Sequence, residues 1–242
     1  MASYYPTEDT HLNIARGLVK SAEVKNIFGY NANVALSFVP LWENNSDYVF
    51  PTANTEMGIK STGSTDNPTI RVIGLDSNYE EIAENITLNG TANTTLANEY
   101  FRINDVVTVA GQANGNVEIR GDSTLYAKIR AREGRNQASF YTVPKGHCFY
   151  LTRIDGLSAT ALSNKYVTFR NLSRFPSAID GEIVEVRVAQ ATFVGQMSID
   201  RQLPFKYNEK TDIVFQAKSS SQTNEVGIFG EGILIKEPLD GS

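Results

Sequence analysis

The sequence of 242 residues predicts an all-β protein, an antiparallel β-sandwich or jelly roll with an extended N-terminal arm and possible division into two β sub-domains. Three observations predict this fold class. From about residue 23 onward, short segments follow one another in which apolar and polar residues alternate. Residues typical of turns separate these segments. Almost no segment has the length or the period of a helix, so the strands are expected to pair antiparallel.

The first 20 residues differ from the rest of the chain. Tyr4, Tyr5 and Pro6 begin an extended arm, because proline disfavours a helical conformation in the residue before it. After the arm, Asp9 or Thr10 can cap a short helix. The apolar face of that helix would hold Leu12, Ala15 and Leu18. An edge strand fits the same stretch equally well, and both interpretations stay open.

A β-hairpin is predicted where two alternating segments flank a polar turn. The segments are 69–73 and 81–88, and Asp76 begins the short polar stretch between them. Short polar side chains hydrogen-bond the nearby backbone and so favour a turn there. Asn89 and Gly90 supply a second turn signal at the end of the hairpin.

Further strands are expected on both sides of this hairpin. The expected ranges are 24–30, 34–42, 99–109, 115–120, 124–132, 138–143, 147–157, 165–171, 182–193, 203–207, 212–218 and 225–236. Proline and glycine in Val143–Gly146 predict a type I turn between two of them. In 182–193, valines alternate with Ile183, Glu185 and Arg187, which predicts a strand with one solvated face.

Four regions follow from this pattern. Residues 1–22 form the N-terminal arm, 23–112 an N-terminal β region, 113–137 connecting strands, and 138–242 a C-terminal jelly-roll-like β-sandwich. The boundary rests on 111–123, which is rich in Gly, Asn and Asp and is typical of a loop. A long loop on one domain remains an alternative to a division into two sub-domains.

Composition argues against several functional classes. The net charge of −5 and a pI near 5.2 disfavour nonspecific nucleic-acid binding, which depends on Lys and Arg. The sequence contains no run of 18 apolar residues, so no membrane-spanning helix is predicted. Cys148 is the single cysteine, so no intrachain disulfide forms. The N-terminus lacks the basic start and apolar stretch of a secretion signal, so we expect synthesis and assembly in the cytoplasm.

No catalytic, metal or cofactor site is predicted. His147 and Cys148 are neighbours in an expected strand, so their side chains point to opposite faces and do not share one metal ion. The sequence holds no G-x-S-x-G nucleophile elbow. The acidic stretch 76–81 lacks the spacing of an EF-hand, which favours a solvated turn over a calcium loop. We therefore expect a protein that is not an enzyme and that has no cofactor.

Two surface patterns are candidate contact sites. In 126–132, three cations and Tyr126 share one face of the expected strand: Lys128, Arg130 and Arg132. Such a face fits an acidic protein surface, although long cations also protect edge strands from unwanted pairing. Trp42 and the many tyrosines fit either sugar stacking or core packing, of which core packing is the commoner.

Several segments together resemble virion structural proteins of tailed bacteriophages, especially marine ones. The resemblance covers most of the chain. It rests on YYPTEDTHLNIARGLV at 4–19, NIFGYN at 26–31, FVPLWEN at 38–44, IRVIGLDSNYEEI at 70–82, ITLNGT at 86–91, YFRIND at 100–105, YTVPKGHCFYLTRI at 141–154 and KTDIVFQAKSSSQTNEVGIFGEGILI at 210–235. These motifs identify a kind of structural protein better than a position in the particle.

The resemblance implies a β-sandwich or jelly-roll viral protein located in the virion, without a reaction centre. It favours a capsid decoration or cement protein on the outer capsid surface, bound to the major capsid protein or other virion proteins. It also favours a homo-oligomer, preferably a trimer. The contact surfaces would be the arm at Tyr4–Pro6 and the Lys128–Arg132 face. The alternatives are a tail adaptor, a fibre or a receptor-binding component, and a carbohydrate-binding domain or glycan hydrolase.

Overall fold

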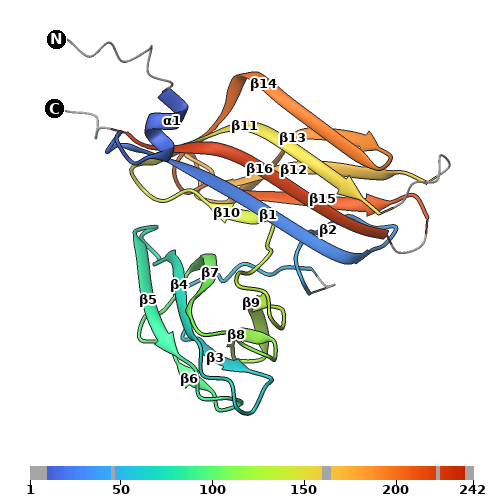
Figure 1. The fold of residues 1–242 in the computed structure, drawn as a ribbon. Coiled ribbons are helices and arrows are strands. Elements are labelled where there is room, and N and C mark those ends of the chain that lie inside the picture. The colour runs from blue at the N-terminus through green and yellow to red at the C-terminus, as the bar shows by residue number, and fades with distance from the viewer. Residues whose placement is uncertain (1–9, 45–46, 160–164, 222–223, 238–242) are drawn as a thin grey trace, which may run out of the picture.

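The structure is a computed structural model that describes residues 10–44, 47–159, 165–221 and 224–237. It confirms the predicted all-β class with antiparallel sheets. Two β-domains lie one above the other, and the larger contains both the first and the last strand of the chain (Figure 1). Within the described residues there is one helix, α1 (Thr10–Ala15), which lies beside the first strand.

The larger domain is a jelly roll made of two facing sheets. One sheet has the order β1-β16-β11-β14 and the other β10-β15-β12-β13. With β10 counted as the second strand of the domain, these orders are 1-8-3-6 and 2-7-4-5, the jelly-roll topology. The strands are β1 (Ala22–Val34), β10 (Phe140–Thr142), β11 (His147–Ser158), β12 (Val167–Pro176), β13 (Ile183–Phe193), β14 (Gln196–Tyr207), β15 (Asp212–Ser219) and β16 (Asn224–Lys236).

The core of the jelly roll forms where the inward-facing residues of both sheets meet. Alternation along β16 turns every second side chain inward, which is the pattern expected for a sandwich. Phe149, Phe169 and Phe215 are fully buried there and belong to one cluster of apolar side chains. This cluster stabilises the domain without a disulfide.

The smaller domain is inserted into the middle of one jelly-roll strand. The short strand β2 (Val39–Pro40) and β10 both pair with β15, with Pro40 opposite Gln216 and Phe140 opposite Val214. Between them, the Ser139 N–H donates to the Leu41 carbonyl at 2.9 Å. The chain therefore leaves the sheet after Leu41 and returns at Ser139, and β2 and β10 are two halves of one interrupted strand.

Gly29 on β1 lies under this point of interruption. A Cβ atom at Gly29 would lie 2.4 Å from the Leu41 carbonyl oxygen and 2.3 Å from the Ser139 Cβ. No larger residue fits without a backbone shift, so the interrupted strand can approach β1 closely only because this residue is glycine.

The inserted domain is a small sandwich with its own core. Its sheets have the orders β6-β3-β8-β9 and β5-β4-β7. The buried residues between them include Ile59, Ile70 and Tyr100. The strands are β3 (Gly58–Ser61), β4 (Thr69–Leu75), β5 (Glu81–Thr87), β6 (Thr94–Thr95), β7 (Arg102–Ala110), β8 (Val117–Gly121) and β9 (Thr124–Ile129).

The structure divides the chain differently from the predicted boundaries. The strand β1, predicted in a region 23–112, pairs along its length with β16 of the C-terminal half. Residues 113–137, predicted as connecting strands, contain β8 and β9 of the inserted domain. Residues 138–242 contain most of the jelly roll but neither β1 nor β2. The predicted boundaries assume that residues close in sequence belong to the same domain, and this assumption fails when one domain is inserted into another.

Of two predicted turns, one is confirmed and the other has a different type. The β4–β5 hairpin is confirmed, and Asp76 Oδ1 accepts the backbone N–H groups of Asn78 and Glu80. The turn expected as type I at Val143–Gly146 is instead closed from His147 N–H to the Pro144 carbonyl. Gly146 then takes its third position with φ of +70°, which is the type II pattern.

The helix alternative is correct for the N-terminal stretch, but its expected apolar face is not the buried one. Leu12 and Leu18 are exposed, and Ile14 is the buried residue of α1. The face that packs on a domain is set by where the helix lies, and the apolar spacing alone does not determine this in so short a segment.

Candidate functional site

The two histidines and the cysteine do not form a site together. His147 Nδ1 lies 2.9 Å from the Lys145 carbonyl oxygen, while the Cys148 side chain is buried, which raises the pKa of its thiol. In the part of the chain that the structure describes, no three His, Cys, Asp or Glu side chains are grouped so as to hold a metal ion. No helix there is long and apolar enough to cross a bilayer.

The predicted contact residues are not brought together. Tyr4, Tyr5 and Pro6 lie outside the described residues. The predicted strand 124–132 ends at Ile129, so the expected row of three cations is wrong. Lys128 is on β9 and partly buried, whereas Arg132 is exposed in a turn with φ of 65°. Tyr126, expected on the same face, is buried in the core of the inserted domain.

Arg130 instead contacts the jelly roll. Its guanidinium carbon lies 4.6 Å from the centre of the Tyr30 ring, and the Tyr30 hydroxyl donates to Glu225 Oε1 at 2.5 Å. A cation over an aromatic face is attracted by the ring's electron density. Arg130 therefore connects the inserted domain to β1, which makes it a residue of the domain junction.

Trp42 is a core residue, which excludes it as an exposed sugar-stacking platform. It is 2% exposed and meets Tyr48 edge-on, with ring centres 5.3 Å apart. Phe140, which stacks on Tyr48, lies 6.0 Å from the Trp42 ring. These rings belong to a cluster between the two domains that also holds Phe50, Leu125, Leu172 and Val214. The core-packing interpretation of Trp42 is therefore confirmed.

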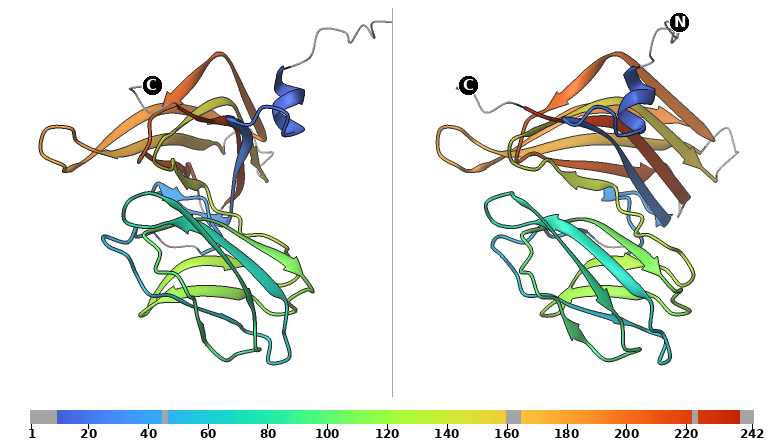
Figure 2. Two further views of the ribbon diagram at one scale, coloured as in Figure 1. Left: turned by 90° about the vertical axis from the view of Figure 1, so that its left-hand side faces the viewer. Right: turned by 60° about the vertical axis from the view of Figure 1, so that its left-hand side comes forward.

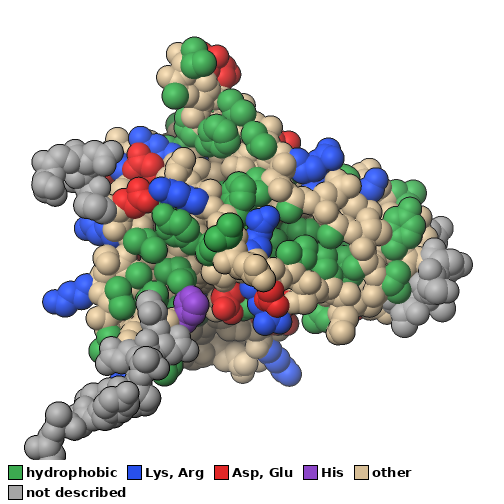
Figure 3. Space-filling model, turned by 90° about the horizontal axis from the view of Figure 1, so that it is seen from above, with side chains coloured by type: hydrophobic (Ala, Val, Ile, Leu, Met, Phe, Trp, Pro, Cys, Tyr) green, Lys and Arg blue, Asp and Glu red, His purple; other side chains and the backbone are tan. Residues whose placement is uncertain are grey.

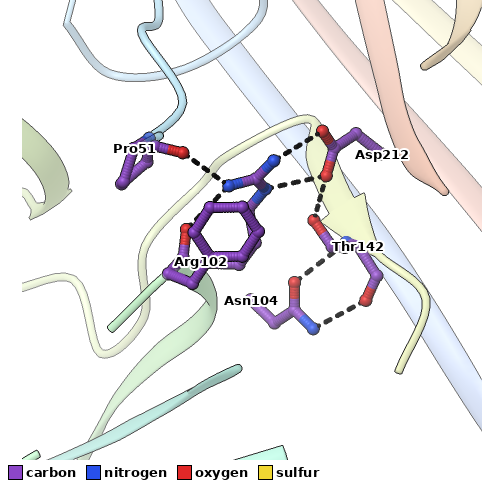
Figure 4. A network of polar contacts seen from close by, with 6 residues as sticks. Pro51, Arg102, Asn104, Thr142 and Asp212 are labelled. Atoms are coloured by element: carbon purple, nitrogen blue, oxygen red, sulfur yellow. Dashed lines mark hydrogen bonds and ion pairs between the residues drawn. The ribbon is translucent and has the colours of Figure 1, made fainter. Parts of the chain in front are cut away.

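The centre of the junction is a buried ion pair between the domains (Figure 4). Arg102 of β7 donates two hydrogen bonds to Asp212 of β15, at 2.9 and 3.1 Å, and both side chains are only 5% exposed. The Thr142 hydroxyl donates to the same carboxylate at 2.6 Å. The remaining Arg102 donor reaches the carbonyls of Pro51 and Phe101, at 2.8 Å each. All the charged atoms are thus hydrogen-bonded.

Neighbouring groups fix this pair in place. The rings of Phe50 and Phe101 lie 4.8 and 3.9 Å from the Arg102 guanidinium carbon. The Asn104 side chain donates to the Thr142 carbonyl and accepts its N–H, both at 2.9 Å. Paired and ring-stacked in this way, the ion pair holds the two domains in one orientation. It was not predicted, because its two members are 110 positions apart.

Glu43 carries a buried carboxylate at the same junction. Its two carboxyl oxygens make no well-formed hydrogen bond in the described part of the chain, although the Arg130 backbone acts on them as a weak donor. Burial raises its pKa to about 7, although the charges of Arg130 and Lys128 act in the opposite direction. Glu43 therefore changes its charge near neutral pH, at the point where the chain leaves the jelly roll.

We expect Glu43→Gln to remove a pH dependence of stability. The folded protein holds the Glu43 proton more tightly than the unfolded chain, so protonation stabilises the fold fully below about pH 4.5. That contribution is lost as the pH rises to about 7. Urea unfolding between these values should show the wild type losing roughly 1–2 kcal/mol relative to the variant, a figure reduced for partial burial.

The matched control for this prediction is Glu99→Gln, since Glu99 is exposed. Its unfolding curves should follow those of the wild type at each pH. A constant difference between wild type and Glu43→Gln over the whole range would contradict the assignment.

A groove of about 340 Å³ lies beside the junction, between the domains. Its polar walls are largely self-paired: Arg135 donates two bonds of 2.8 Å to Asp105, and Gln137 donates to Glu133. Phe28 of β1, 42% exposed, lines one side. The groove therefore combines an exposed aromatic ring with amide side chains, whereas Trp42 is buried.

The most exposed large apolar residue among the described residues, Ile179, lies on the hairpin of β12 and β13. This hairpin projects from the jelly roll (Figure 2). Ile179 at its tip is 96% exposed, and Ile183, Val184 and Val186 on β13 are exposed as well. Seen from above, hydrophobic side chains lie between charged ones across the upper surface of the molecule (Figure 3). The prediction that β13 has only one solvated face is wrong, because both faces of 183–187 are exposed.

Comparison with known proteins gives little further information. No protein-family model and no curated protein matches the chain. A structure of the infectious bursal disease virus Gt strain is similar at 9% identity, over 96% of this chain and 75% of that one, with a TM-score of 0.22. Particles with T=1 symmetry derived from that virus give 10% identity, 91% and 79% coverage and a TM-score of 0.12. Both scores are too low to indicate a shared fold, and neither protein is described as coming from a bacteriophage.

Proposed function

We propose that this chain is a virion structural protein that binds the outer capsid surface as a decoration or cement protein. The observation that carries the proposal is the projecting β12–β13 hairpin with its exposed apolar residues Ile179, Ile183 and Val186. Exposed apolar residues that cluster are typical of contact sites. The resemblance of the sequence to virion proteins of tailed bacteriophages supplies the class of partner, most simply the major capsid protein.

The jelly roll supports the proposal without deciding it. This topology is common in viral capsid proteins, but also in lectins and cupins, so the fold alone does not fix the function. The junction adds support, because the buried Arg102–Asp212 pair links the two domains and restricts their relative motion. A rigid block loses little conformational freedom when it binds, which favours adhesion by complementary surfaces.

The wider setting follows the same resemblance. The protein would be made and assembled in the bacterial cytoplasm, where a chain with a single cysteine needs no disulfide. A closed homo-oligomer is the default for such a subunit, and the trimer implied by the resemblance stays a prediction. The arm at Tyr4–Pro6 and the cations Lys128 and Arg132 stay proposed contacts of lower rank than the hairpin.

We expect the double substitution Ile179→Asp with Ile183→Asp to weaken attachment to capsids at least roughly tenfold. Two charges on the hairpin would have to be buried without partners in the contact. The measurement is occupancy on purified heads that lack this protein, by quantitative mass spectrometry. Leu36→Asp is the matched control, because Leu36 is 63% exposed in the β1–β2 loop.

Equal occupancy of the wild type and the hairpin variant would rule out the hairpin as the contact. A second candidate is a tail adaptor, fibre or receptor-binding component, which the groove beside Phe28 favours as a place for a surface glycan. Labelled copies seen by electron microscopy separate the two. Many copies over the head support decoration, and a few at the tail support the alternative.

A further inference from the structure

We propose that β13 is a contact between two copies of this chain, in which β13 pairs antiparallel with β13 of a second copy about a two-fold axis at Val186. This deepens the proposed function, because it names one partner of the exposed hairpin. Its starting point is the position of β13 in the sheet.

β13 is an unprotected edge strand. It is the last strand of its sheet, and no strand among the described residues pairs with its outer edge. Its regular part, Ile183–Arg187, pairs residue by residue with β12, and the register shifts only beyond it. Proteins normally protect such an edge with Lys, Pro or a covering segment. This stretch reads IVEVR, with neither Lys nor Pro, and every residue in it is exposed.

In one antiparallel register of two β13 strands, each charged side chain lies opposite a side chain of the opposite charge. When the axis passes through Val186, Glu185 lies opposite Arg187 of the second copy, and Arg187 opposite its Glu185. Directly opposite side chains on one face of an antiparallel pair interact most strongly. An axis at Glu185 or at Arg187 would instead place two like charges together. A one-residue offset would bring opposite faces of the strand together.

The apolar face of β13 fits the same register. Val186 would meet Val186 of the second copy on the face that lines a hollow of about 470 Å³ with Phe175, Pro176, Val188 and Phe205. Pairing would therefore extend an apolar surface that is already present. On the other face, Glu185 lies 3.5 Å from Arg174 of its own chain but remains 51% exposed, so it is free to reach a second cation.

The contact is small. Five residues of strand span about 16 Å, so the interface falls at the lower end of specific contacts. We expect a dissociation constant on the order of micromolar, which allows assembly to be driven by high local concentration on a particle. If the subunit is also a trimer, this two-fold contact would link trimers to each other.

Charge reversal provides the test, with the full chain in sedimentation velocity over concentrations on the order of 1–100 µM. Glu185→Arg alone and Arg187→Glu alone each place like charges in both pairs, and each should weaken self-association at least about tenfold. The double variant Glu185→Arg with Arg187→Glu restores opposite charges and should associate as the wild type does. A mixture of the two single variants should associate with each other although neither does so alone.

Glu182→Arg is the matched control, because Glu182 is exposed on the same hairpin and would face the uncharged Gln190 of the second copy. A wild type that stays monomeric, or single variants that associate like the wild type, would overturn the proposal. So would a mixture that associates no better than its components. Head occupancy of the same variants separates the two proposals, since capsid attachment without self-association leaves only the proposed function standing.

Discussion

Replacing Asp212 by alanine is expected to lower the free energy of unfolding by about 3–5 kcal/mol. The Arg102 guanidinium, 4% exposed for the whole residue, would stay buried between the domains without a counter-charge. The Thr142 hydroxyl would lose its acceptor as well. Because the pair joins the two domains, removing it should also allow the domains to move more freely relative to each other. Urea unfolding measures the first effect, and hydrogen exchange at the junction measures the second.

Two further variants make this result specific. Asp200→Ala removes an exposed carboxylate 3.6 Å from Arg153, and we expect a change within roughly 0.5 kcal/mol. The double substitution Arg102→Met with Asp212→Leu removes both buried charges and should recover most of the loss. A loss below roughly 1 kcal/mol for Asp212→Ala would mean that the pair does not hold the junction.

The contrast between predicted and unpredicted features follows sequence distance. The β4–β5 hairpin was predictable, because Asp76 forms its turn with residues two and four positions away. The interrupted strand was not, since the Leu41 N–H meets the Ser139 hydroxyl across 98 positions. No local sequence signal marks a strand that is interrupted by an inserted domain. The missed strand β3 is four residues long and has no alternation of apolar and polar residues to read.

The candidate contact site shows the same limit. The alternation in Ile183–Val188 correctly predicted a strand, but it could not place that strand at a sheet edge, where both faces stay exposed. The alternation in 126–132 places Lys128, Arg130 and Arg132 on one face only if the strand extends to residue 132, and the sequence determines strand ends only to within a few residues. One local signal for the hairpin was present, since Ile179 stands between a Pro-Ser-Ala and an Asp-Gly stretch, where an apolar residue is unusual.

Phe215→Ala should cost about 3–5 kcal/mol of unfolding free energy. Phe215 is fully buried on β15 and packs edge-on against Phe169, with ring centres 5.6 Å apart. Its backbone bonds to Leu41 and Ser139 at the interrupted strand do not depend on the side chain. The loss should therefore come from the cavity alone. Phe28→Ala, at an exposed ring, should cost roughly 1 kcal/mol or less in the same urea titration.

Gly230 provides an independent check of that cavity. A Cβ atom on Gly230 would lie 2.6 Å from the Phe215 ring, so Gly230→Ala alone should destabilise the fold. In the Phe215→Ala background the ring is absent, and the added methyl group enters the cavity instead. The two losses should then be non-additive, with the double variant more stable than their sum predicts by roughly 1 kcal/mol or more. Strict additivity would show that β15 and β16 do not pack through this contact.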